Sequence, residues 1–417
     1  MGEHRKQRRA RGMTVRGRGG TRQKSGLLDE STPRELNRAA RKANRGVARR
    51  RVLLAIIGAL VIIGASVGLS FLARDRPSTT TEPQVIPSEV GASLLIAVTD
   101  SAGSDLSLAL LGTHDQAATV ALFPPGLLTV LPGFGDREIS DSTRFGDEDL
   151  PALTVANLLG VRVDGTAQIT VDELAGLLDG DLTVDLTSPL VVANGSSEIV
   201  QMDVGSAPRS PDEITQLFSL QGTGTQLEWL DRQGSVWRAL FDRMNSSGRL
   251  VEGVLGRVVG DPALVREALV GVATADDPQL TAVPAERIER PGGDSELYQM
   301  SGEDATAFAA ERYPYLQFVA GDRPRVEILN GNGRIGTTRP VAAALIRHGF
   351  RVVRTDNADR ADYEETQIIS QGRDHQQAAL DARSVLGSGE VLIEVRHPSG
   401  VVDVTIIVGQ DIPAQEA

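Results

Sequence analysis

The sequence contains no cysteine, and aromatic residues make up only 4% of it. Without cysteine the protein has neither disulfide bonds nor thiolates that bind a metal or attack a substrate. Histidine is another common zinc ligand, but the five histidines are scattered along the chain (His4, His114, His348, His375 and His397). We therefore predict no metal site and no bound cofactor, and packing alone must hold the fold together.

One long stretch, residues 52–73, carries no charged side chain. As a helix, its 22 residues would extend about 33 Å, enough to cross a bilayer core of about 30 Å. A cleaved signal peptide has a shorter apolar region nearer the N-terminus, and a buried helix of a soluble domain shows a polar face. The pattern therefore predicts a transmembrane signal anchor that is retained and spans the membrane once.

Charge is distributed unevenly on the two sides of this span. Residues 1–51 hold 17 Lys and Arg against 4 Asp and Glu, whereas the rest of the chain holds 26 against 51. Because basic segments stay on the inner side, we predict a cytoplasmic tail and extracytoplasmic C-terminal domains at the cell membrane. The tail has few large apolar residues, so we expect it to be disordered. Its arginines suit anionic lipid headgroups, and we do not expect nucleic acid as a partner.

Beyond the span, residues 74–91 are rich in Pro, Thr and Ser and indicate an extended linker. Short apolar runs follow at strand spacing, at residues 93–98, 106–112 and 118–123. Helical patterns at 148–159, 171–178, 211–220 and 227–244 are interspersed with strand patterns at 166–171 and 182–186. Alternation of this kind predicts the α/β fold class, in two extracytoplasmic domains.

The order of several segments after residue 92 carries a family resemblance. In chain order they are SLLIAVTDSAGSDLSLALLG, ATVALFPPGLLTVLPG, REISDSTRFG, LLGVRVDGTAQITVDELAGLLDG and LDRQGSVWRAL. This order is similar to the extracytoplasmic domain of the LytR-CpsA-Psr (LCP) family, whose members transfer glycopolymers from a polyprenyl diphosphate carrier onto peptidoglycan. The resemblance implies an LCP-like domain at residues 92–312, and of the family's site it implies only Asp100, Asp105 and Arg232 here.

The LCP-like domain departs from the family where a diphosphate would bind. A diphosphate requires several arginines, and its Mg²⁺ requires carboxylates. The family's Ser-Ile-Pro-Arg-Asp motif is LFPPG here, at residues 122–126. Gly103 replaces an expected arginine, and the arginine pair expected near residues 217–221 is absent. We therefore predict a degenerate domain without catalytic residues, and a divergent transferase that uses Mg²⁺ is the alternative.

Residues 313–323 contain Pro and Gly and predict a hinge, with Tyr313 and Tyr315 as its anchors. Beyond it, residues 324–411 contain VEILNGNGRIG, AALIRHGFRVV, NADRADYEETQIIS and VTIIVGQD. Through these stretches the last segment closely resembles the LytR C-terminal domain. Strand and helix patterns alternate along it, so we predict a compact α/β unit that folds alone.

A glycine loop follows the first strand of this segment and includes Asn330, Gly331, Gly333 and Gly336. It matches G-x-G-x-x-G, and Asp356 follows as it would in a dinucleotide site. The segment is nevertheless too short for two nucleotide-binding halves, and a proline would fall inside the following helix. We favour a structural turn with free amides at the helix start, where a weak anion or glycan contact is an alternative.

Two functions of different classes follow from these patterns. We predict a membrane-anchored, non-catalytic cell-envelope protein whose partners are the membrane and either a cell-wall polymer or another envelope protein. The alternative is a divergent LCP transferase that moves a glycan onto peptidoglycan. The sequence leaves the ligand and the oligomeric state open.

Overall fold

The computed structural model describes residues 91–115, 117–145, 148–289, 296–396 and 400–413. The predicted tail (1–51), membrane span (52–73) and nearly all of the linker (74–91) lie outside these residues. Among the residues that are described, no helix is long and apolar enough to cross a bilayer. The chain divides into two units, Met1–Thr80 and Thr81–Ala417, and only the second contains described residues.

A six-stranded sheet forms the centre of the LCP-like domain, in the order β11-β6-β1-β2-β3-β12. Its strands are β1 (Ala92–Thr99), β2 (Asp105–His114), β3 (Ala117–Phe123), β6 (Gly165–Thr170), β11 (Val258–Gly260) and β12 (Gln279–Ala282). β1, β2 and β3 are antiparallel neighbours, as their three apolar runs predict. β6 pairs with β1, and β12 with β3, both in parallel.

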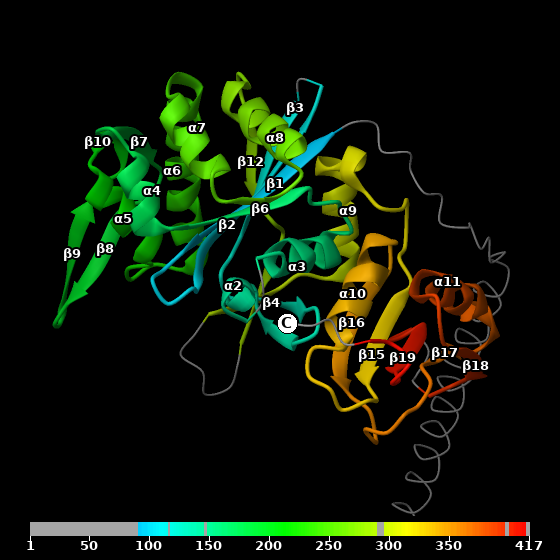
Figure 1. The fold of residues 1–417 in the computed structure, drawn as a ribbon. Helices are drawn as coiled ribbons and strands as arrows, with labels where there is room; N and C mark the ends of the chain where they lie inside the picture. The colour runs from blue at the N-terminus through cyan, green and yellow to red at the C-terminus, as the bar shows by residue number, and fades with distance from the viewer. Residues whose placement is uncertain (1–90, 116, 146–147, 290–295, 397–399, 414–417) are drawn as a thin grey trace, which may run out of the picture. The chain divides into compact units, whose positions relative to one another are not determined.

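Both faces of this sheet are covered, which explains the long apolar runs in β1, β2 and β3. Leu94 and Ile96 of β1 pack toward one face, and Leu95 and Ala97 toward the other. Helices α6 (Gln226–Ser246), α7 (Gly248–Leu255) and α8 (Pro262–Thr274) cover the first face, and α3 (Leu150–Leu159) and α9 (Gly302–Arg312) cover the second (Figure 1). The predicted α/β class is confirmed in this three-layer arrangement.

Helix starts in this domain agree with local capping signals. Ser210 caps α5 (Pro211–Ser219) and Thr225 caps α6, each in a capping box with a glutamate three residues later. Asp261 caps α8 by accepting hydrogen bonds from two backbone amides. Thr170 caps α4 (Val171–Leu177) in the same way as Ser210.

Several short strands in the LCP-like domain have no counterpart among the predicted elements. One sheet has the order β13-β14-β4-β5, and two further ribbons pair β10 with β7 and β8 with β9. Their bounds are β4 (Leu127–Leu131), β5 (Gly135–Glu138), β7 (Leu182–Leu186), β8 (Leu190–Asn194), β9 (Ser197–Met202), β10 (Gly205–Arg209), β13 (Glu286–Ile288) and β14 (Leu297–Gln299). The exception is β7, which the alternating apolar and polar residues of LTVDL predict.

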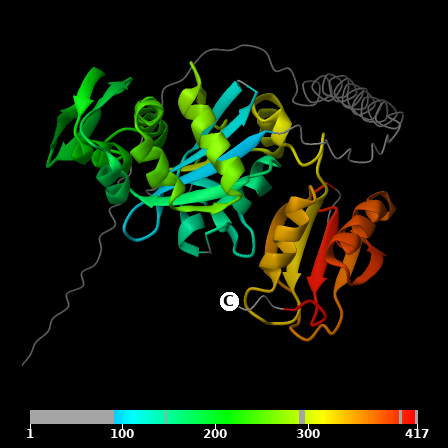
Figure 2. The same cartoon turned by 45° about the horizontal axis from the view of Figure 1, so that its top comes forward.

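The last segment contains a five-stranded sheet in the order β16-β15-β19-β17-β18. The strands are β15 (Arg325–Asn330), β16 (Arg351–Asn357), β17 (Gln367–Gln371), β18 (Glu390–Glu394) and β19 (Val404–Val408). Helices α10 (Thr338–Arg347) and α11 (Gln376–Leu386) pack against one face of it (Figure 2). Here too the predicted alternation of strands and helices is confirmed.

Residues 313–323 are packed against the LCP-like domain rather than free. Tyr313 is fully buried and its hydroxyl donates to the Leu110 carbonyl over 2.9 Å. The ring of Tyr315 stacks on His114 with 5.0 Å between centroids. The two tyrosines therefore anchor this segment, as expected, but the expectation that it isolates the C-terminal unit needs correction. Apolar residues of α3 share a hydrophobic cluster with the C-terminal sheet.

Candidate functional site

Asp105 lies at the start of β2 and is only 2% exposed. It accepts hydrogen bonds from the Ser142 hydroxyl (2.8 Å), from the Thr143 amide (3.1 Å) and from the Thr143 hydroxyl. Burial raises the pKa of Asp105 to about 6, although these hydrogen bonds act in the opposite direction. The carboxylate therefore holds the short helix α2 (Ser142–Phe145) against β2.

Asp100 lies in the turn between β1 and β2. Its Oδ1 atom accepts hydrogen bonds from the amides of Ala102 and Ser104, each over 2.8 Å. This is the local pattern by which an aspartate closes a turn. The turn brings Gly103 to a positive φ of 82°, so the glycine that replaces an expected arginine is needed for the backbone there.

Arg232 is buried in α6, with 2% of its surface exposed. Its guanidinium donates to the carbonyl oxygens of Gln221 (2.6 Å) and Pro189 (3.2 Å) and to the Ser188 hydroxyl (3.4 Å). Desolvation lowers the pKa of Arg232. The arginine thus joins two loops to α6 through neutral oxygens, and its guanidinium does not face solvent.

The three positions that resemble the family's site are not joined to one another. Each is engaged by its own neighbours, and within the described residues no hydrogen bond joins Asp105 to Arg232. A Mg²⁺ ion also lacks a suitable donor set, because the oxygens of Asp105 already accept three hydrogen bonds. No group of three His, Asp or Glu side chains in the described ranges is arranged to hold a metal.

The glycine loop of the C-terminal segment is closed by its own asparagines. Asn330 Oδ1 accepts from the amides of Asn332 (3.3 Å) and Gly333 (3.0 Å). Asn332 Oδ1 accepts from the Arg334 amide over 3.0 Å, and its Nδ2 donates to the Gly409 carbonyl over 2.9 Å. These three loop amides are therefore not free. Helix α10 begins at Thr338 without a side-chain cap, so the expectation of free amides at the helix start stays a prediction.

Each glycine of this loop is needed for its own structural reason. A Cβ atom on Gly331 would lie 2.6 Å from a methyl group of Ile407 and 2.9 Å from the ring of Tyr363. Gly333 and Gly336 have positive φ angles of 68° and 82°. Asp356, the candidate ribose ligand, instead accepts from the Arg354 guanidinium at 2.7 Å. The geometry favours a packing turn over a dinucleotide site.

A hollow of about 630 Å³ lies beside α3, where no sequence motif indicates a site. Its apolar lining includes Leu153, Ala156 and Phe318, and its charged lining residues are Asp149, Arg162, Asp164 and Arg347. Arg347 lies 3.8 Å from Asp149, so the charges at this hollow are paired. A volume of this size is in the range of small-ligand sites.

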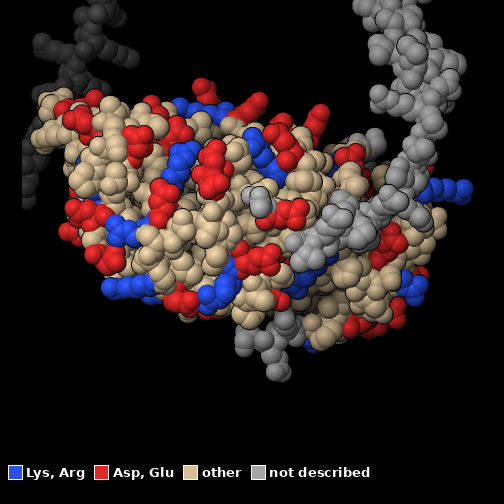
Figure 3. Space-filling model, turned by 90° about the horizontal axis from the view of Figure 1, so that it is seen from above, with Lys and Arg blue, Asp and Glu red and all other residues tan. Residues whose placement is uncertain are grey.

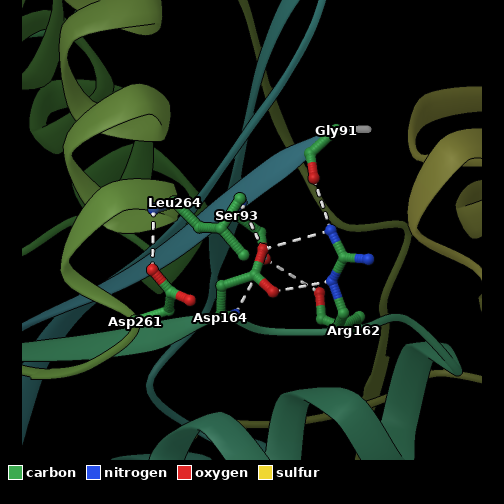
Figure 4. Close-up of polar contacts among 6 residues, drawn as sticks. All are labelled: Gly91, Ser93, Arg162, Asp164, Asp261 and Leu264. Atoms are coloured by element: carbon green, nitrogen blue, oxygen red, sulfur yellow. Dashed lines mark hydrogen bonds and ion pairs between the residues drawn. The ribbon is translucent and has the colours of Figure 1, made fainter. Parts of the chain in front are cut away.

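One wall of this hollow is a buried polar cluster (Figure 4). Arg162 Nε lies 2.6 Å from Asp164 Oδ1, and the same guanidinium donates to the Gly91 carbonyl. Ser93 at the start of β1 receives a hydrogen bond from the Asp164 amide over 3.0 Å and donates from its hydroxyl to the Asp164 carboxylate over 2.9 Å. The cluster ties the beginning of β1 to the loop before β6, and its charges are neutralised internally.

On the face shown in Figure 3, acidic and basic side chains are interspersed. This face therefore shows no large field of one sign that would steer a highly charged polymer from a distance. Recognition of a charged ligand on this face must depend on individual contacts.

Residues 323–411 match the model of the LytR_C family, described as LytR cell envelope-related transcriptional attenuator. The C-terminal segment is similar to this family. The resemblance predicted from VEILNGNGRIG and the later motifs is therefore confirmed. A comparison with curated protein sequences finds no match.

Solved structures similar to the chain include LCP proteins. B. subtilis TagV is 15% identical with a TM-score of 0.45, over 54% of this chain and 97% of that chain. B. subtilis TagU is 16% identical with a TM-score of 0.41, over 54% and 97%. A LytR-Csp2A-Psr enzyme from Actinomyces oris is 13% identical with a TM-score of 0.42, over 54% and 90%. The family named by these structures is the one that the sequence resembles, and no residue role is taken from them.

Proposed function

We propose that the chain is a membrane-anchored, non-catalytic binding protein of the cell envelope. The observation that supports this most is the use of Arg232, whose guanidinium donates to two backbone carbonyls and a hydroxyl instead of facing a ligand. A diphosphate without guanidinium partners would lose its hydration without compensation. The similarity of residues 323–411 to an envelope-related family supports the cell envelope as its place of action.

The proposal includes the anchor at residues 52–73 and two extracytoplasmic domains that bind wall polymer or another envelope protein. The hollow beside α3 is where we expect an uncharged ligand, because its floor is apolar and its rim charges are paired. A glycan segment has the hydroxyl groups and apolar ring faces that suit such a surface.

The test is a transfer assay with the purified full-length chain. A lipid-diphosphate glycan, Mg²⁺ and peptidoglycan are incubated with the parent, with Asp105→Asn and with the control Asp115→Asn, whose carboxylate is exposed at the far end of β2. We expect no transfer by any of the three, and co-sedimentation of all three with peptidoglycan. Transfer by the parent and the control that disappears in Asp105→Asn would establish the divergent transferase instead.

A further inference from the structure

Two arginines near the start of the C-terminal segment have no acidic partner. Arg351 at the start of β16 makes no side-chain hydrogen bond or ion pair with any described residue. Arg323 donates through Nη2 to the carbonyls of Asn157 (2.6 Å) and Leu158 (3.3 Å), but its Nη1 is buried without a hydrogen-bond partner. Guanidiniums removed from water are normally paired, so this arrangement is unusual.

Arg351 lines a hollow, and Arg323 is bound to two of the residues that line it. The hollow has a volume of about 300 Å³, and its lining includes Arg351 together with Asn157 and Leu158, the residues whose carbonyls hold Arg323. Burial lowers the pKa of Arg323 to about 9, and the charge of Arg351 contributes to this decrease. The two guanidiniums are therefore close enough to repel each other.

Glycines provide the space for both guanidiniums. A Cβ atom on Gly302, the first residue of α9, would overlap Nη1 of Arg351. A Cβ atom on Gly160, which follows α3 at a φ of 75°, would lie 2.8 Å from Nε of Arg323. A methyl group at either glycine would therefore displace the arginine that lies against it.

We propose that this hollow binds an oxyanion, the phosphate or carboxylate group of a ligand, through Arg351, with Arg323 as a second positive charge nearby. A planar guanidinium with free N–H groups matches the geometry of either group, and an anion bound to Arg351 offsets the repulsion between the two guanidiniums. The acidic lining residue, Asp136, does not form an ion pair with Arg351. This inference does not depend on whether the LCP-like domain is catalytic.

A purely structural role explains only part of the arrangement. Arg323 Nη2 stabilises the C-terminal end of α3, where backbone carbonyls lack helical partners. This contact accounts for neither the unpartnered Nη1 of Arg323 nor the position of Arg351. An anion in the hollow explains the position of Arg351, because it supplies the acceptors that this guanidinium lacks.

The test is thermal unfolding of the purified full-length chain at constant ionic strength, with chloride replaced by inorganic phosphate, by acetate or by glycerol phosphate. We expect a saturable increase in Tm with at least one oxyanion, and the three probes separate phosphate from carboxylate recognition. Arg351→Gln should weaken the binding by about tenfold to a hundredfold, because it removes the charge-assisted hydrogen bonds. The matched control is Arg266→Gln, which removes a guanidinium that pairs with Glu252 on the surface at 2.9 Å.

The same variants distinguish a binding site from a structural contact. In chloride alone, Arg351→Gln should not lower the Tm, since it removes a cation that has no partner. Gly302→Ala tests the same binding site in a second way. Its methyl group displaces the Arg351 guanidinium without removing the positive charge. The proposal is overturned if oxyanions raise the Tm of parent and Arg351→Gln equally, as general salt effects would, or if no oxyanion acts beyond chloride.

Discussion

Replacing Asn157 by leucine should separate β16 from helix α3. In the parent, Asn157 Nδ2 donates to the Val352 carbonyl and the Val352 amide donates to Asn157 Oδ1, both over 2.8 Å. Asn157 is 3% exposed and Val352 is 1% exposed. β16 is the edge strand of its sheet, so this amide side chain takes the place of a neighbouring strand.

The magnitude follows from the two backbone groups that lose their partner. A buried polar group without a hydrogen bond costs about 1 to 3 kcal/mol, so an unpaired amide and carbonyl at Val352 together cost about 2 to 5 kcal/mol after some relaxation. Leucine is branched like asparagine but larger, so none of this effect comes from a cavity, and overpacking adds to it. We expect a local loss of stability, centred on the contact between α3 and β16.

Hydrogen exchange at the Val352 amide is the most direct assay, with urea unfolding as the global measurement. Exchange at this amide should become faster by about thirtyfold or more in Asn157→Leu. The control is Thr154→Val in the same helix, which removes a buried hydroxyl that has no hydrogen-bond partner and should not destabilise the protein. Equal exchange at Val352 in parent and Asn157→Leu would refute the assigned role of the side chain.

Three further predictions concern other parts of the chain. Because the folded pKa of Asp105 is about 6, the folded state binds more protons than the unfolded chain between about pH 4 and 6, so stability falls as pH rises through this window. Asp105→Asn should remove about 2 kcal/mol of this decline between pH 4.5 and 7, measured by urea unfolding relative to the parent, and an unchanged difference would contradict the prediction. Gly331→Ala should destabilise the protein by about 1 to 3 kcal/mol through overpacking. At Gly336 a methyl group meets open space, so Gly336→Ala should destabilise it by only about 1 kcal/mol, through backbone strain at positive φ. Equal unfolding midpoints for the two variants would contradict this prediction. Protease added to intact spheroplasts should digest the chain beyond residue 74 and spare a tag at Met1, whose digestion would reverse the proposed topology.

Much of the fold could be predicted because its signals are local. β1 to β3 are uninterrupted apolar runs because both faces of their sheet are covered. Ser210 and Asp261 stand directly before prolines at helix starts, and both cap their helices. Such signals depend on neighbouring residues alone, so they are visible before the tertiary structure is known.

Other elements depend on distant contacts and leave a weak pattern. β13 and β14 have three residues each, and β14 pairs with β4, which lies far earlier in the chain. Helix α9 buries mainly alanines and one phenylalanine, so its apolar stripe is narrow. The anchoring of residues 313–323 also depends on tertiary contacts, because Tyr313 donates to a carbonyl in β2.

The candidate sites show the same difference between local signals and tertiary contacts, and show it more strongly. Asp105 and Arg232 carry the right chemical groups for a diphosphate site, but sequence cannot show that those groups are already engaged by Thr143, Gln221 and other neighbours. The opposite is true of the hollow that Arg351 lines, because no sequence motif marks Arg323 or Arg351 as site residues. What identifies that position is a missing partner, and a missing partner becomes visible only when α3, β16 and the start of α9 are brought together. Where the residues that match a family's motif are already engaged by their neighbours, an unpaired buried charge is a better guide to a binding site than the motif.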